Sequence, residues 1–241
     1  MHVRTLVIAA LVGVSATLAA CSSDNTLGLA VAGGTNTDTL SNARIRVVNA
    51  TATSLDVATA GTVGTGNAAI GFGAASSCIS TSSTRPNVAV RVAGSSTVLP
   101  GLATAYQSGV AYTVIAYPGA GGATQIATIS DAFTPISGEV GLRVFNAGAS
   151  GTSYDVYVTA PGASLATTPP SFGAVTTGTA TNFLGLSTTS PQQVRITTTG
   201  SKAVLLDLGN LALAAGQNAT LVVAPPASGS TAPRAFFAAG C

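Results

Sequence analysis

The chain has 241 residues, of which 46% are hydrophobic and only 7% are charged, and its formal net charge is +2. This hydrophobic content is too high for a disordered chain, and the absence of a Lys/Arg cluster argues against binding to nucleic acid. The only histidine is His2. Once the N-terminal residues are removed, histidine-dependent triads and metal sites are excluded. We therefore expect no enzymatic activity, no cofactor and no metal site.

Residues 1–20 are predicted to be a signal peptide. Arg4 is followed by an almost unbroken apolar run from Leu6 to Leu18. This run is shorter than the roughly 20 residues that span a bilayer, but it is typical of an export signal. The sequence Leu-Ala-Ala-Cys that ends at Cys21 resembles a bacterial lipobox, which implies cleavage before Cys21 and lipid attachment to it. The alternative is an ordinary signal cleaved near Ala20 that leaves Cys21 free.

The residues after Cys21 indicate where the protein is held. Ser22 rather than Asp follows the cysteine, and by resemblance to the enterobacterial sorting pattern this favours the outer membrane. Two or more acyl chains anchor a protein stably, at about 0.8 kcal/mol per buried methylene. Residues 21–40 are rich in Ser, Thr, Asn and Gly, so we expect a lipidated flexible tether that reaches about 25 Å from the membrane.

The rest of the chain is predicted to be one unit written twice, as domains of residues 41–135 and 136–241. Arg46-Val47-Val48-Asn49-Ala50 returns as Arg143-Val144-Phe145-Asn146-Ala147. Further matched pairs are Asp56-Val57 with Asp155-Val156, Gly71-Phe72-Gly73-Ala74 with Ser171-Phe172-Gly173-Ala174, Val90-Arg91-Val92 with Val194-Arg195-Ile196, and Thr113 with Thr220. The offset only grows along the chain, from 97 (Arg46 and Arg143) to 107 (Thr113 and Thr220). Chance matches would scatter in both directions, so a duplication sets the architecture.

Each copy is predicted to consist of short strands. Strands are expected at residues 43–48, 88–92, 112–117 and 124–129 of the first copy, and at 140–145, 154–158, 194–196, 219–224 and 234–238 of the second. Alternation of valine with arginine predicts one packed face and one face in water. Gly/Pro-rich turns at 118–122 and 225–229 predict hairpins. The only helix candidate is Leu211–Ala215. The expected fold class is all-β, with two tandem immunoglobulin-like β-sandwich domains after the signal and tether.

These motifs resemble those of the bacterial domain of unknown function 4397. The resemblance is carried by ARIRVVNA at residues 43–50, the Asp-Val strand at 56–57, and YTVIAYPG at 112–119. It covers residues 43–129 and, more weakly, 140–238. The second copy departs from the pattern because Ala219 replaces the later tyrosine. The resemblance implies an exported, surface-type β-domain and implies no activity.

Two cysteines remain if Cys21 carries lipid. In an oxidising compartment Cys78 and Cys241 are predicted to form a disulfide. It would close a loop of about 160 residues, which corresponds to at most about 4–5 kcal/mol on the entropic model. The alternative is two free thiols.

Five groups of residues are weighed as sites. Asn49 and Asn146 end strands just before loops. Asn at such a position usually caps a turn, and the alternative is that it contacts a ligand. Asp56 and Asp155 are expected to pair across the first hairpin with Arg46 and Arg143, facing solvent.

The glycine clusters at 61–73 and 119–122 lack a phosphate-loop pattern and are expected to be flexible loops. Ser201-Lys202 is the one arrangement that could give a serine a base, and we do not expect catalysis there. The five tyrosines are expected to pack in the sheets; a stacking platform for sugar or protein is the alternative. They are Tyr106, Tyr112, Tyr117, Tyr154 and Tyr157.

The sequence thus favours a non-enzymatic, lipid-anchored cell-envelope protein at the outer membrane. Its sandwiches would act as a structural or protein-interaction module. The alternative is a surface protein that binds carbohydrate or peptide in adhesion. The expected partners are the membrane, through the anchor, and an envelope protein or glycan; the oligomeric state is left open.

Overall fold

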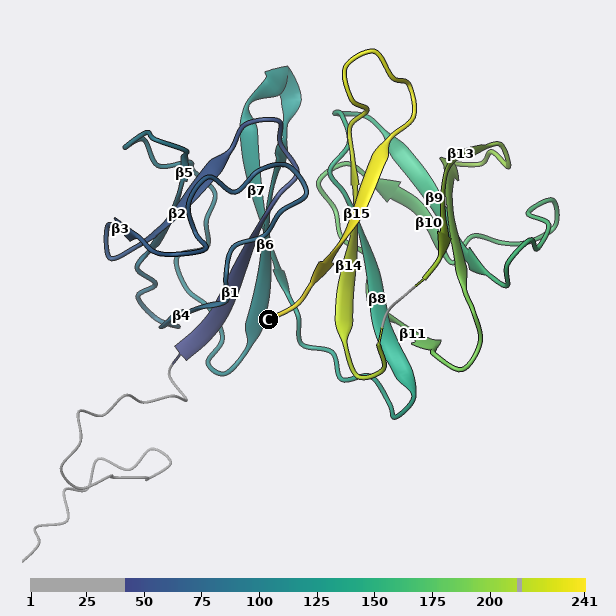
Figure 1. The fold of residues 1–241 in the computed structure, drawn as a ribbon, viewed down its shortest axis with the longest axis horizontal. Coiled ribbons are helices and arrows are strands. Elements are labelled where there is room, and N and C mark those ends of the chain that lie inside the picture. The colour runs from purple at the N-terminus through teal and green to yellow at the C-terminus, as the bar shows by residue number, and fades with distance from the viewer. Residues whose placement is uncertain (1–41, 212–213) are drawn as a thin grey trace, which may run out of the picture. The chain divides into compact units, whose positions relative to one another are not determined.

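The computed structural model describes residues 42–211 and 214–241, whose regular structure is almost entirely β-strand (Figure 1). The signal, the tether and Cys21 lie outside the described residues, as does part of the helix candidate Leu211–Ala215. Within the described ranges the one helical element is the short 3-10 turn η1 (Ala120–Gly122), which forms the glycine-rich turn of the first predicted hairpin. The predicted all-β class is confirmed.

Each predicted strand is found, and the structure adds strands that the sequence did not predict, at residues 62–63, 79–82, 172–176, 184–187 and 204–210. The first half contains β1 (Asn42–Asn49), β2 (Leu55–Thr59), β3 (Thr62–Val63), β4 (Ile79–Ser82), β5 (Val88–Val92), β6 (Ala111–Pro118) and β7 (Thr124–Ser130). The second half contains β8 (Glu139–Asn146), β9 (Ser153–Thr159), β10 (Phe172–Thr176), β11 (Leu184–Ser187), β12 (Gln193–Thr198), β13 (Val204–Asn210), β14 (Asn218–Ala224) and β15 (Arg234–Ala239).

The strands form four sheets, and each sheet takes its strands from one half only. The first half has the sheets β4-β1-β6-β7 and β3-β2-β5, and the second half has β11-β8-β14-β15 and β10-β9-β12-β13. The pairs β1–β6 and β8–β14 are parallel, and every other pair is antiparallel. The predicted hairpins are found as β6–β7 and β14–β15.

Each half is a sandwich with its own apolar core. In the first half Ile45 and Val47 of β1 pack with Leu55, Val57 and Val90 from the facing sheet. In the second half Leu142 and Val144 occupy the same places in β8, against Val156 and Ile196. Alternate residues of β1 and β8 therefore point into the cores, as period-two strands require.

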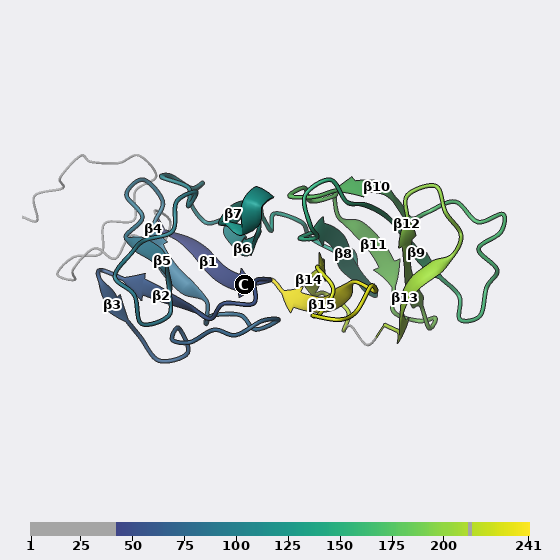
Figure 2. The ribbon, with the colours of Figure 1, turned by 90° about the horizontal axis from the view of Figure 1, so that it is seen from above.

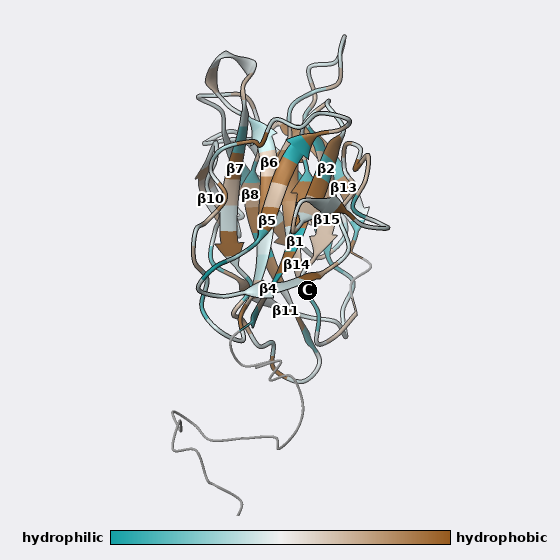
Figure 3. Cartoon of the chain, turned by 90° about the vertical axis from the view of Figure 1, so that its left-hand side faces the viewer, coloured by the Kyte–Doolittle hydropathy of each residue, from teal (hydrophilic) through white to brown (hydrophobic). Residues whose placement is uncertain are grey.

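The other face of β8, and of β1 from Arg46 onward, is also largely buried, and there the prediction of a water-exposed face is wrong; Arg44 of β1 is exposed. A third apolar cluster lies between the sheets β4-β1-β6-β7 and β11-β8-β14-β15. Its buried members are Val48, Ala50, Ile115, Phe145, Ala147, Val222, Ala224 and Ala238. All described strands belong to one compact unit, and Figure 2 shows the two inner sheets side by side between the outer ones. Brown, hydrophobic segments run along β1, β6 and β8 in Figure 3. These strands carry apolar residues on both faces, so burial removes both from water.

The two halves meet through equivalent residues, as in an isologous dimer. Arg46 of β1 donates to the carbonyls of Ala239, the last residue of β15, and of Gly240 directly after it. Its counterpart Arg143 of β8 donates to the carbonyl of Ser130, at the end of β7. The third apolar cluster is likewise built from equivalent residues of the two halves. It contains Val48 and its counterpart Phe145, Ala50 and Ala147, and Ile115 and Val222.

Backbone bonds correct two details of the predicted alignment. Gly73 N bonds to Asn49 O, and Gly178 N bonds to Asn146 O in the same way. Thr177, not Phe172, is thus the counterpart of Phe72. Phe172 lies in the core of the second half.

Similarly, Val90 faces Val57 while Ile196 faces Val156. Ile196 rather than Val194 is therefore the counterpart of Val90. The offset between equivalent residues of the two copies still only grows along the chain. Most of the growth occurs between β9 and β10, where the second copy has its extra residues.

The predicted disulfide is confirmed. Cys78, just before β4, is bonded to Cys241, just after β15, with their Cα atoms 5.7 Å apart. The bond joins the first half to the end of the second.

Candidate binding groove

Asn49 and Asn146 hold loops together, which confirms the predicted capping role. The amide of Asn49 donates to the carbonyls of Thr53 and Ile70 at 2.8 Å each, and its oxygen accepts from Thr51 N at 2.8 Å. Asn146 makes the equivalent three bonds in the second half. Both side chains are fully buried. Their hydrogen bonds are used within the protein, so neither side chain is offered to a ligand.

The expected Asp–Arg pairs across the first hairpin of each copy are absent, and that prediction is wrong. Asp56 accepts from the backbone N–H groups of Ala69 (2.7 Å) and Gly94 (3.0 Å). These two bonds, with the nearby charge of Arg91 as a smaller effect, hold the pKa of the Asp56 carboxyl below its usual value of 3.8. Asp155 accepts in the same way from Ala174 (2.8 Å) and Gly200 (2.9 Å). Both carboxylates are loop anchors.

The arginines face the other half of the molecule. Arg143 is only 2% exposed and forms a buried ion pair with Asp131, and its Nε donates to Thr220 at 2.8 Å. Burial lowers the pKa of Arg143 while the charge of Asp131 opposes this shift, and a guanidinium remains charged in either case. Arg46 is half-buried and bonds only to carbonyls in the part of the chain described.

Lys202 does not contact Ser201 as a base would. Its Nζ donates to Thr168 O (2.6 Å) and to the Tyr157 hydroxyl (3.1 Å), and it lies 4.8 Å from the centre of the Tyr157 ring. Ser201 Oγ instead accepts from Ala203 N at 3.1 Å. Lys202 thus fastens the loop between β9 and β10 over the outer sheet.

The tyrosines do not gather into one platform. Tyr154 and Tyr157 are buried, and Tyr106 and Tyr112 pack on each other with ring centres 4.9 Å apart. Burial raises the pKa of Tyr106 to about 12, with a smaller contribution from Tyr112. Tyr117 alone lines a groove.

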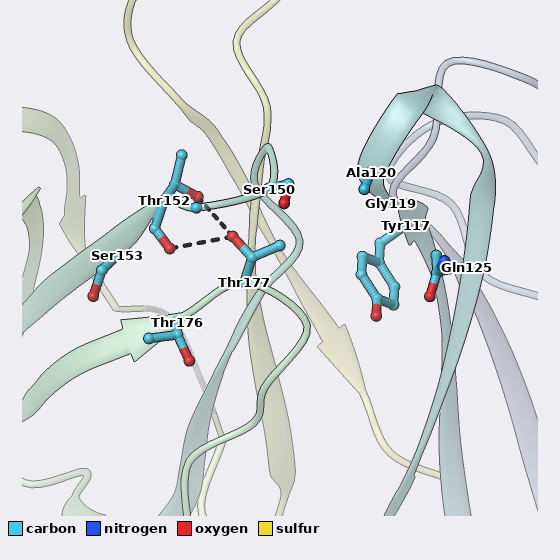
Figure 4. Close-up of a pocket in the computed structure, with 10 residues that line it drawn as sticks. Tyr117, Gly119, Ala120, Gln125, Ser150, Thr152, Ser153, Thr176 and Thr177 are labelled. Atoms are coloured by element: carbon cyan, nitrogen blue, oxygen red, sulfur yellow. Dashed lines mark hydrogen bonds between the residues drawn. The ribbon is translucent and has the colours of Figure 1, made fainter.

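That groove lies at one end of the contact between the inner sheets, and Figure 4 shows its walls. Its volume is about 360 Å³, near the lower bound of small-molecule sites. One wall is the β6–β7 hairpin, with Tyr117, Gly119, Ala120 and Gln125; the other is the β8–β9 loop and the end of β10, with Ser150–Ser153, Thr176 and Thr177. The lining contains one aromatic ring, one amide and several hydroxyls, and no charged side chain.

The groove walls are held by internal hydrogen bonds. Thr177 Oγ1 donates to the carbonyls of Ala149 (2.7 Å) and Thr152 (3.2 Å), and lies 3.0 Å from Thr152 Oγ1. Tyr117 meets Phe145 edge-on, with ring centres 5.3 Å apart. The groove is therefore formed before any ligand arrives.

A second hollow of about 340 Å³ lies by the disulfide, between Arg44, Asp131, Asn218 and Cys241. Its carboxylate is already paired with Arg143, which leaves Arg44 as the only charged group in it that is not in an ion pair within the described chain. We give it no role.

Sequence patterns missed the groove, although they placed its strands. Gln125, Ser150 and Thr177 belong to loops and strand ends with no motif, and they meet only because the two halves pack face to face. The glycine cluster at 119–122, expected to be a flexible loop, supplies part of one wall.

Two further searches cover only the described ranges. No three His, Cys, Asp or Glu side chains there gather as they would around a metal ion. None of the helical segments described is long and apolar enough to cross a membrane.

No protein-family model matches the chain, and a comparison with curated proteins finds no match either.

Proposed function

We propose that the protein is a non-enzymatic, lipid-anchored component of the cell envelope at the outer membrane, in which the two sandwiches form a single structural or protein-interaction module. The observation that supports this most strongly is the contact between the inner sheets. A buried ion pair, an apolar cluster and a disulfide fasten the two halves. Such a body suits a rigid spacer or docking unit carried on a tether.

The use of charged side chains supports the non-enzymatic part of this proposal. Asp56, Asp131, Asp155, Arg143 and Lys202 all bond to backbone or to each other. Catalysis needs such groups to converge on open space with matched pKa values. These five charged groups are instead held by loops and by the contact between the halves.

The anchor is tested with the Cys21→Ala variant in the native host. We expect the wild-type protein to incorporate labelled fatty acid and to fractionate with the outer membrane. The variant should incorporate none and appear in the soluble fraction. Equal labelling of both proteins would contradict the lipobox proposal.

The interaction role is tested with the folded chain, residues 41–241, immobilised and exposed to envelope extract. A protein captured at stoichiometric amount, and released when the extract is pre-treated with soluble residues 41–241, supports a docking module. Absence of any such protein would leave only the spacer role.

The second candidate is a surface protein that binds carbohydrate or peptide. The groove beside Tyr117 favours it, because concave sites with an aromatic ring and a few polar groups are typical of ligand binding. A glycan array and a peptide array probed with the same chain test this candidate. Failure on both would remove it and leave the structural module in place.

We also propose that each half belongs to the immunoglobulin-like class and resembles the domain of unknown function 4397. Seven strands in sheets of four and three in the first half support the former. The duplicated Val-x-Asn-Ala strand ends, with their buried Asn side chains, support the latter.

A further inference from the structure

The groove has a counterpart on the other side of the same contact, where the equivalent space is filled. We call the groove the open end and its counterpart the filled end. In β6–β7, Tyr117 faces Gln125, and in β14–β15, Ala224 faces Arg234. Gln125 is therefore the counterpart of Arg234. Since Thr177 is the counterpart of Phe72, the two groove walls match a second pair of walls residue by residue.

At the filled end, the protein provides the occupant. The guanidinium carbon of Arg234 lies 3.5 Å from the centre of the Phe72 ring, and Phe72 meets Phe236 edge-on at 5.5 Å. Nε of Arg234 donates to Pro225 O at 2.9 Å. The ring of Phe72, from the first half, thus lies under the planar guanidinium of Arg234, from the second half, in a cation–π contact.

At the open end, Thr177 stands in the place of Phe72, and Gln125 stands in the place of Arg234. Both side chains are too short to fill the space, and the groove of about 360 Å³ remains. Tyr117 adds an aromatic ring at a position where the filled end has only Ala224.

The position of Tyr117 is fixed by its surroundings. Its ring packs edge-on against Phe145. Its hydroxyl lies above Gly178, where a Cβ atom would come within 2.8 Å of it. A preformed aromatic surface lowers the entropic cost of binding.

The chemistry of the lining selects an uncharged, hydroxyl-rich ligand. A charged ligand would lose water without gaining a counter-charge. Hydroxyl and amide side chains both donate and accept, and so match the hydroxyls of a sugar. An extended peptide is usually held by the backbone of an open sheet edge, whereas these walls present side chains.

We propose that this groove binds one or two rings of a neutral saccharide, packed on Tyr117 and hydrogen-bonded to Gln125 and the hydroxyls of the opposite wall. This inference rests on the carbohydrate-binding candidate above, whose site it names.

The test transplants the occupant of the filled end into the groove. The double variant Thr177→Phe/Gln125→Arg recreates Phe72 and Arg234 at the open end. A second variant, Ser150→Arg, adds bulk and charge from an exposed position on the groove wall and disturbs no core. Both variants and the wild-type residues 41–241 are applied to an array of neutral and acidic oligosaccharides and to a peptide array. Thermal melting confirms that each is folded.

The matched control is Phe72→Thr/Arg234→Gln, which makes the reverse exchange at the other end. We expect the wild type and the control to bind the same neutral oligosaccharides, and both groove variants to lose that binding. Acidic oligosaccharides should not be preferred.

Other outcomes overturn the inference at different levels. Neutral glycans that still bind to both groove variants would place the site elsewhere and leave the carbohydrate-binding candidate standing. A preference for acidic glycans, or binding of a peptide that the groove variants lose, would overturn the saccharide class. No binding of any oligosaccharide by the wild type would remove the inference and the carbohydrate half of that candidate, and no binding of peptide as well would remove the candidate.

Discussion

Asp56 and Asp155 occupy equivalent positions and do the same work in both halves. Each carboxylate accepts two backbone N–H groups, one from an alanine with positive φ (Ala69 at 49°, Ala174 at 50°). The second donor is a glycine after the next strand of the same sheet. A left-handed alanine is strained, and the charge-assisted bond helps to hold it. Each aspartate therefore fixes the two loops that follow its strand and its neighbour.

We expect Asp155→Ala to lower the free energy of unfolding by about 2–4 kcal/mol, since two hydrogen bonds to a buried charged group are lost. Urea denaturation measures the change. Asp155→Asn keeps one accepting oxygen and should lose less. A change in the alanine variant smaller than about 0.5 kcal/mol, as for ordinary surface positions, would contradict the anchoring role.

Asp56 should also make stability depend on pH. Its pKa is lower in the folded chain than the usual 3.8 because the folded chain bonds to the charged form. The stabilisation is therefore complete above 3.8 and is lost as the pH falls through the lower, folded value. We expect the difference in unfolding free energy between wild type and Asp56→Asn to shrink across that acidic range. A difference that stays constant in acid would show that the carboxylate charge is not involved.

The inner strands β1 and β8 show how a buried face of a strand can be mistaken for a face exposed to water. The alternation of apolar and polar residues along each strand predicts one apolar face and one face in water, and the prediction of the apolar face is correct. The other face carries Arg44 and Arg46 in β1 and Arg143 in β8, which suggested water. In the structure Arg46 and Arg143 both reach the end of a strand in the other half. Arg143 pairs there with Asp131, the half-buried Arg46 bonds to carbonyls, and Arg44 is exposed.

Within β8, Arg143→Ala should be far more harmful than the equivalent change in β1. It would leave the Asp131 carboxylate buried without its partner, which typically costs about 3–5 kcal/mol. Arg46→Ala removes bonds to neutral carbonyls from a half-buried side chain, and we expect a loss of about 0.5–1.5 kcal/mol. Guanidinium chloride denaturation of the two variants gives the comparison. Equal losses would mean that the ion pair carries no special weight.

Strand positions, both hairpins and the duplication could be predicted because they depend on local alternation, turn residues and repeated words. The hydrogen-bond partners of Asp56 lie 13 and 38 residues away in sequence, and no local rule reaches them. The replacement of Phe72 by Thr177 was hidden because Phe172 offered a better match in letters. The groove depends on that replacement, so it could not be predicted without the packing of the halves.

At the scale of the whole molecule, two sandwiches share a buried contact and act as one body. The disulfide between Cys78 and Cys241 adds a covalent link across 163 residues of sequence. The third apolar cluster already holds the halves together, so the bond strengthens an existing contact.

Removing that bond should lower stability without unfolding the protein. We expect Cys78→Ser/Cys241→Ser to reduce the free energy of unfolding by about 2–4 kcal/mol, below the entropic maximum for so long a loop. Denaturation of the oxidised wild type and the double variant measures this, and a reductant should weaken the wild type alone. Equal stability of the two proteins would show that the bond has little effect on the folded body.

Whether the thiol of Cys78 is free or in the disulfide also depends on how far synthesis of the chain has proceeded. Synthesis proceeds from the N-terminus, so Cys78 is completed 163 residues before its partner. Cys78 is exposed and has no disulfide partner until the second half has been made. A chain that stops short of Cys241, or whose β14–β15 hairpin fails to dock, would keep this thiol. Reaction of Cys78 with a thiol reagent would thus separate finished molecules from unfinished ones in a single measurement.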